Sequence, residues 1–272
     1  MSKEDCCDDH FCPGSRSGNK LLLLLAFALF LCVAFYSTDG CASKGTSIAV
    51  LATPKFVPQS QPDSIVQTGI RETSTGGIFL QWYAAEGAAG YEVYRSDTTN
   101  INKVPIRFSV VMNVPATSVL ADTTAVDRNL LSIGGTYYYY LRAYSSDQTL
   151  SVASDTISYG ILQGLQPTFP INNDSVSAGS FQFVWYDYTG GGYTVKRVRD
   201  ITDVPSVYAW VSRRFKIFGA FPGSKPYDFD GSPAKHLVPG NSYQWLVERF
   251  DVDSTGRPYE GSTSAWATFT VK

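Results

Sequence analysis

One pattern occurs twice in this chain, and it constrains the fold more than any other feature of the sequence. In each copy a run of alternating apolar residues ends in a tryptophan, a glycine–tyrosine pair begins a second run, and a glycine turn precedes a further tyrosine. The tryptophan and the last tyrosine are 55 positions apart in the first copy (Trp82 and Tyr137) and 58 in the second (Trp185 and Tyr243). Self-similarity over this length predicts two domains of one architecture, not one large core.

Within both copies the apolar residues alternate with polar ones, which is the period of a half-buried β-strand. Ile78, Leu80 and Trp82 share one face of such a strand, and clusters of Gly, Pro, Asn and Asp separate one run from the next. No segment after residue 45 has the spacing of an amphipathic helix. We therefore predict an all-β fold in which short strands pack as two sandwiches.

Segments 90–96, 121–124 and 134–139 resemble bacterial fibronectin type III domains. The resemblance covers residues 62–160 well and 166–272 more loosely, and it implies two tandem immunoglobulin-like/fibronectin type III β-sandwiches. Modules of this family serve as spacers, adhesive units and accessory domains, so the resemblance implies no single activity.

The same resemblance assigns structural roles to the repeated aromatic residues. It implies that Trp82 and Trp185 pack in the two cores, and that Tyr137 and Tyr243 each form a tyrosine corner after the glycine turn.

We expect four segments along the chain. They are a signal or anchor segment over 1–41, a proline-containing tether over 42–61, a fibronectin type III-like domain over 62–162, and a second, divergent one over 164–272. The second domain differs from the first chiefly in 200–235, which is longer and more basic than usual and whose role the sequence leaves open.

Residues 21–36 are an apolar run with two basic residues just before it, which predicts an N-terminal hydrophobic signal or anchor helix. Three interpretations of this segment stay open. In the first, Gly40 and Cys41 resemble the end of a bacterial lipoprotein signal, with Cys41 as the lipid anchor. In the second, an ordinary signal peptidase cleaves after Ala42, and in the third the apolar run is not cleaved and stays as a single-pass membrane anchor. We expect the protein in the cell envelope, membrane-anchored and facing outward, with secretion as the alternative.

Composition argues against several kinds of chemistry. All five cysteines lie in the first 41 residues, so the folded part has neither disulfides nor thiolate metal sites. Three of the 22 basic and five of the 24 acidic residues also lie there, which leaves 19 of each and gives no electrostatic footprint for nucleic acid. His236 is the one histidine after the anchor, and the Asp-Gly segments at 228–231 and 251–256 read as turns. We expect no catalytic residue, no cofactor and no metal.

Three tyrosines are the candidate ligand contacts. If Tyr137 and Tyr139 face inward, then Tyr138 and Tyr140 face outward, and Tyr94 lies outward on a strand expected to neighbour them. Such side chains could stack on sugar rings or contact a protein, or they could simply favour a strand with one wet face.

We therefore expect a protein that is not an enzyme. It would be a non-catalytic, envelope-anchored or exported binding or scaffolding protein, with a protein or glycan at the cell surface as partner and the membrane reached through the N-terminal segment. One alternative is a glycan-binding accessory protein that uses Tyr94, Tyr138 and Tyr140. Another is a hydrolase whose acids meet at the joint between the domains.

Overall fold

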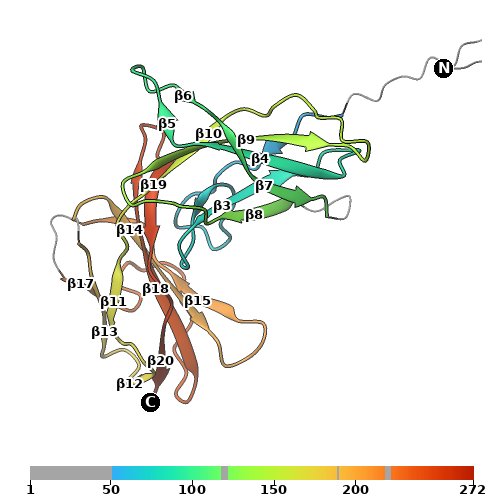
Figure 1. The fold of residues 1–272 in the computed structure, drawn as a ribbon. Helices are drawn as coiled ribbons and strands as arrows, with labels where there is room; N and C mark the ends of the chain where they lie inside the picture. Colours follow the sequence, from blue (N-terminus) through green and yellow to red (C-terminus); the bar gives the residue numbers. More distant parts are fainter. Residues whose placement is uncertain (1–50, 118–121, 189, 218–221) are drawn as a thin grey trace, which may run out of the picture. The chain divides into compact units, whose positions relative to one another are not determined.

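The computed structural model describes residues 51–117, 122–188, 190–217 and 222–272 (Figure 1). Throughout these ranges the regular structure is β-strand, which confirms the all-β prediction. The expected signal or anchor segment, including Cys41, lies outside the described residues. Among the described residues, no helix is long and apolar enough to cross a membrane.

Residues 51–162 are called the N-terminal half, and the part of it that the structure describes contains ten strands. They are β1 (Lys55–Phe56), β2 (Arg71–Glu72), β3 (Ile78–Tyr83), β4 (Gly90–Ser96), β5 (Thr98–Thr99), β6 (Pro105–Ile106), β7 (Ser109–Pro115), β8 (Thr123–Asp127), β9 (Thr136–Tyr144) and β10 (Ile157–Ile161). β3 pairs with β1, β2 and β8, and the other sheet runs β10-β9-β4-β7. β5 and β6 pair only with each other among the described strands, as a small hairpin.

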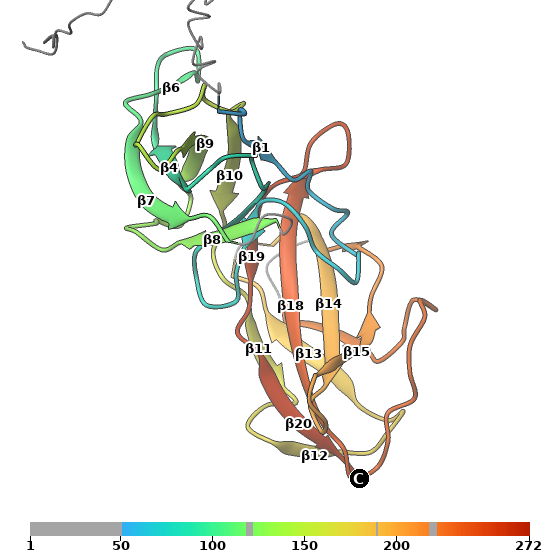
Figure 2. The ribbon, with the colours of Figure 1, turned by 90° about the vertical axis from the view of Figure 1, so that its right-hand side faces the viewer.

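Residues 164–272, the C-terminal half, contribute the remaining strands. They are β11 (Gln166–Phe169), β12 (Asp174–Val176), β13 (Gln182–Tyr186), β14 (Tyr193–Asp200), β15 (Val207–Val211), β16 (Phe215–Lys216), β17 (Pro222–Pro226), β18 (Ser242–Val252), β19 (Pro258–Thr263) and β20 (Ala267–Val271). β13 lies between β11 and β17, and the long β18 lies between β14 and the β19–β20 segment (Figure 2).

β3 and β9 bury alternate residues, as the period of the sequence predicts, whereas β14 and β18 bury runs of consecutive residues. Along β3 every second side chain from Ile78 to Trp82 is buried, and β9 buries Tyr137, Tyr139 and Leu141 in the same way. In the N-terminal half these side chains from facing sheets form one apolar cluster. A second large cluster in the C-terminal half is formed chiefly by β13, β14, β15, β18 and β20. The predicted burial of Trp82 and Trp185 is confirmed.

Both tyrosine corners are also confirmed. The hydroxyl of Tyr137 accepts a hydrogen bond from the backbone N–H of Ser132 at 2.5 Å, and that of Tyr243 accepts one from Val238 at 2.9 Å. In each case the donor lies five residues upstream of the tyrosine. A phenol that is buried with its hydroxyl satisfied by the backbone fixes the turn at the start of the following strand.

The sheets of the two halves are continuous. β10 pairs in parallel with β19, with Gly160 opposite Glu260 and Ile161 opposite Gly261. Glycine is required at both positions by close approach. A Cβ on Gly160 would lie 2.7 Å from the Cβ of Glu260, and one on Gly261 would lie 2.5 Å from the hydroxyl of Tyr159.

The structure differs from the sequence analysis at the start of the N-terminal half. Lys55 and Phe56, in the segment expected to be a tether, form β1 and pair with Tyr83 and Trp82 of β3. Pro54 beside them is buried. The reason is that β3 has a free edge at this end, and two residues of extended chain satisfy its backbone groups.

Candidate binding surface

The candidate surface is the outer face of the sheet formed by β10, β9, β4 and β7. Tyr94 on β4 lies opposite Tyr140 on β9. Their rings stack with centroids 4.5 Å apart and an angle of 13° between the planes. Phe108, just before β7, packs against Tyr140 with centroids 4.8 Å apart. We call Tyr94, Phe108 and Tyr140 the aromatic face.

Hydrogen bonding and charge fix the position of Tyr94. Its hydroxyl donates to Oε2 of Glu92 at 2.5 Å. That hydrogen bond is the main reason why the pKa of Tyr94 is raised, to about 12. The phenol therefore stays neutral at physiological pH, and the strong hydrogen bond to a carboxylate holds its ring against Tyr140.

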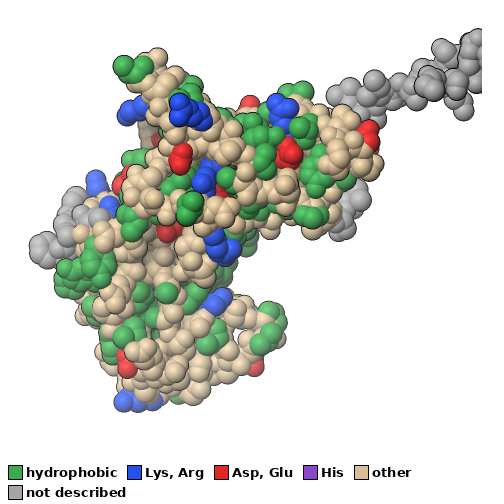
Figure 3. Space-filling view, viewed as in Figure 1, with side chains coloured by type: hydrophobic (Ala, Val, Ile, Leu, Met, Phe, Trp, Pro, Cys, Tyr) green, Lys and Arg blue, Asp and Glu red, His purple; other side chains and the backbone are tan. Residues whose placement is uncertain are grey.

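Of the three predicted tyrosines, the structure brings two together. Tyr138 lies on the same outward face of β9 as Tyr140, opposite Ser96 of β4 and Ser158 of β10. All three tyrosines are half-buried, so each ring shows only part of its area to solvent. Hydrophobic side chains are interspersed with charged ones over the visible surface (Figure 3). The sequence alternation identified the face of the tyrosines, but not the stacking or the part played by Phe108.

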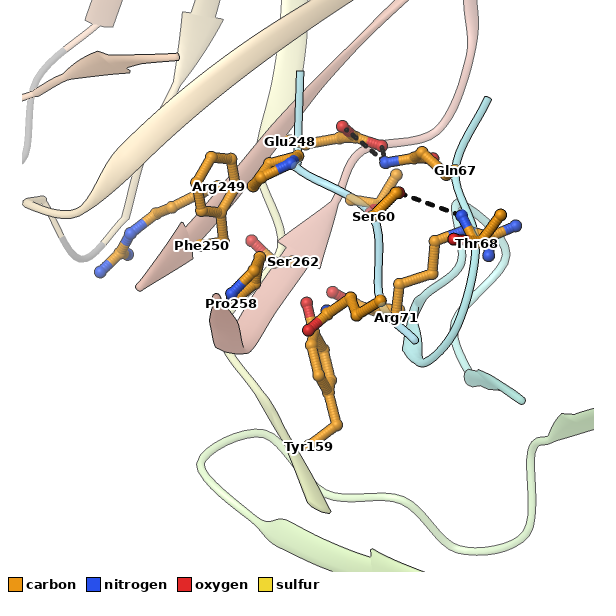
Figure 4. Close-up of a pocket in the computed structure, with 14 residues that line it drawn as sticks. Ser60, Gln67, Thr68, Arg71, Tyr159, Glu248, Arg249, Phe250, Pro258 and Ser262 are labelled. Carbon is orange, nitrogen blue, oxygen red and sulfur yellow. Dashed lines mark hydrogen bonds between the residues drawn. The ribbon is translucent and has the colours of Figure 1, made fainter. Parts of the chain in front are cut away.

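Acidic side chains lie where the N-terminal and C-terminal halves meet, which we call the joint, as the hydrolase alternative requires. Arg197 of β14 and Glu248 of β18 form a buried ion pair at 2.9 Å. Arg197 also donates to the backbone carbonyls of Pro62 and Ser64. Gln67 donates to the carboxylate of Glu248 (Figure 4). Both charges are thus paired and hydrogen-bonded, which is the arrangement of a structural contact.

A further acid at the joint is Glu72. Burial is the main cause of its raised pKa, about 8, with the charge of Glu248 acting in the same direction and a backbone hydrogen bond from Thr263 opposing it. The adjoining cavity, lined also by Arg71 and Tyr159, has a volume of about 30 Å³, which is room for a water molecule or two. A sugar ring does not fit in this cavity.

Other polar groups singled out in the sequence have ordinary positions. His236 is exposed. The carboxylate of Asp253 accepts hydrogen bonds from the backbone N–H groups of Thr255 and Arg257, which is the chemistry of a turn. Among the described residues, no group of three or more His, Cys, Asp and Glu side chains is placed to hold a metal ion.

Comparisons with known proteins yield distant similarities. No protein-family model matches the chain. Seed agglutinin 2 of Robinia pseudoacacia is 28% identical over 161 residues, which cover 53% of this chain and 54% of that protein. The chain therefore spans about half the length of the curated relative it matches.

Two solved structures align with the chain only poorly. Pectate lyase PelI from Erwinia chrysanthemi, in complex with tetragalacturonic acid, has a TM-score of 0.27 and 17% identity, over 48% of this chain and 35% of that one. The FN1–FN3 domains of chicken CNTN1 have a TM-score of 0.26 and 12% identity, over 81% of this chain and 66% of that one. At these TM-scores neither similarity bears on the function of this chain.

Proposed function

We propose that this protein is a non-catalytic binding protein of the cell envelope, which contacts a protein or glycan through the aromatic face of its N-terminal half. The observation that carries the proposal is the stacked pair of Tyr94 and Tyr140. Phe108 packs against Tyr140, and Glu92 accepts a hydrogen bond from the hydroxyl of Tyr94. Rigid aromatic side chains lose little conformational entropy on binding and commonly dominate contact energies. The similarity to a seed agglutinin supports binding over catalysis.

The anchoring part of the proposal rests on the sequence. The apolar run 21–36 followed by Gly40 and Cys41 supports attachment to a membrane through a lipidated Cys41. The two halves would then be presented away from that membrane on the segment that leads to β1.

The test compares two double variants of the full chain in detergent. Replacing Tyr94 and Tyr140 with serine should reduce binding to isolated cell envelopes, or to the glycans retained on an array, by more than about tenfold. The matched control replaces Tyr186 and Tyr188, whose rings lie 4.7 Å apart and which are 41% and 47% exposed. The control should leave binding unchanged.

The melting temperature of the variant shows whether the aromatic face is exposed for binding or buried against another part of the protein. The Tyr94 and Tyr140 variant should keep a melting temperature close to that of the parent, because the buried cluster is untouched. Undiminished binding, or a fall in melting temperature of more than about 10 °C, would refute the aromatic face as the contact surface.

A further inference from the structure

A groove in the C-terminal half lies apart from the aromatic face. It has a volume of about 440 Å³ and lies between residues 166–173, where the chain passes from β11 to β12, and residues 265–268 at the start of β20. This volume falls within the range of small-molecule sites. Its lining contains no charged side chain.

A fixed indole lies at one side of the groove. The guanidinium of Arg199 covers one face of the Trp266 ring at 4.0 Å. Arg199 in turn donates two hydrogen bonds to the side-chain oxygen of Gln244, at 3.1 and 2.6 Å, and Gln244 donates to the hydroxyl of Thr268 at 3.1 Å. Because Arg199 occupies one face and Trp266 is only half-buried, the exposed part of the ring is available to a ligand.

A loop with a fixed backbone, residues 171–173, also lines the groove. Asn172 and Asn173 have φ values of 50° and 66°, in the left-handed region that asparagine tolerates better than most residues. The backbone N–H of Ile171 donates to the carboxylate of Asp174, and the backbone N–H of Asn173 donates to the carbonyl of Thr268. The loop is therefore held by its backbone and by Asp174. The exposed amide side chains of Asn172 and Asn173 make no hydrogen bond within the described part of the chain.

The chemistry of the groove selects a class of ligand. Each amide offers two N–H donors and a carbonyl acceptor, which match hydroxyl groups that both donate and accept. The C–H face of a pyranose is apolar and packs on an indole. The groove lining holds no charged side chain that could pair with an acidic sugar, a phosphate or a metal, and the nearby Arg199 already donates to Gln244. We propose that this groove binds a neutral oligosaccharide, with Trp266 against a sugar ring and the amides of Asn172 and Asn173 on its hydroxyl groups.

The experiment uses the full chain in detergent and soluble neutral oligosaccharides as probes. Maltohexaose, cellohexaose and mannohexaose would be titrated by calorimetry and saturation-transfer NMR, with hexagalacturonate as the acidic comparison. At least one neutral probe should bind saturably. Trp266→Ala should weaken that binding at least about tenfold, and Trp266→Phe, which keeps a flat ring, should restore it to within a few fold. Asn172→Gly, which removes an amide at a φ that glycine accepts, should also weaken it.

Two controls make the outcome decisive. Tyr259→Ala removes an aromatic ring that is 46% exposed on β19, outside the groove, and should leave binding unchanged. The Tyr94 and Tyr140 double variant should also leave it unchanged, so this inference and the proposed function can fail separately. The inference is overturned if no neutral probe binds, if only the acidic one binds, or if Trp266→Ala binds as the parent does.

Discussion

Lys196 of β14 is completely buried in the core of the C-terminal half. Its ammonium nitrogen has no hydrogen-bond partner among the described residues. It lies over the rings of Phe229 at 4.4 Å, Trp185 and Phe215 at 4.7 Å, and Trp210 at 5.8 Å. We predict that Lys196→Met stabilises the protein, because methionine fills a similar volume and brings no charge into the core.

The magnitude follows from the pKa of Lys196. Burial lowers it from 10.5 to about 6, with nearby Lys225 acting in the same direction and Asp230 opposing. The unfolded chain therefore binds a proton that the native state does not bind between about pH 6 and 10.5. At pH 7 this costs roughly 4 to 5 kcal/mol. The neutral amine and its alkyl chain keep their packing against the four rings, and methionine must refill the same space, so we expect Lys196→Met to gain about 2–4 kcal/mol.

The assay is denaturant unfolding followed by tryptophan fluorescence at pH 5, 7 and 9. Because the folded pKa is depressed, stability of the parent should rise with pH from about 6 upward, and Lys196→Met should lack that part of the rise. Lys235→Met, at an exposed lysine of the same half, is the matched control and should change stability little. If Lys196→Met is no more stable than the parent at pH 7, the ammonium is stabilised by the rings and the reasoning is wrong.

Three further predictions concern the cores, the joint and the N-terminus. Trp82→Ala and Trp185→Ala should each cost about 3–5 kcal/mol in denaturant unfolding, and a loss below about 1 kcal/mol would contradict their burial. Between about pH 4.5 and 8 the native state holds a proton on Glu72 that the unfolded chain releases, so the free energy of unfolding should fall as the pH rises through this range. Glu72→Gln should remove that fall, and an unchanged pH profile would count against a buried carboxyl. Cys41→Ser should move the protein out of the detergent phase or stall its processing, whereas a mature start at Ser43 without lipid, seen by mass spectrometry, would indicate ordinary secretion.

The sequence predicted those features that depend on local periodicity. Alternation along 78–82 and 137–141 reports which side chains are buried, because the two faces of a strand differ. Pairing between distant segments leaves no such signal. The two residues of β1 carry no pattern of their own, and Lys196 reads as an ordinary polar position in an alternating strand although it lies in the core. Trp266 lies in a short irregular stretch between β19 and β20, where alternation gives no guide to which surface it joins.

The stacking of Tyr94 on Tyr140 shows the same limit at the candidate surface. Alternation places both on the outward side of their strands, but their contact requires the register that sets residue 94 opposite residue 140. A shift by one position would put Tyr94 opposite an inward-facing residue. Register is set by turns and by the packing of both faces, and a single sequence does not state it.

The pairing of β10 with β19 has a consequence for any shortened version of the protein. Unpaired strand edges invite edge-to-edge association with other chains. In the intact chain each of these strands covers the other, through Gly160 and Ile161 on one side and Glu260 and Gly261 on the other. A fragment ending near residue 162 would leave the edge of β10 bare, and one beginning near 164 would do the same for β19. Such fragments are expected to self-associate as concentration rises, unless a lysine or proline is placed on the bare edge.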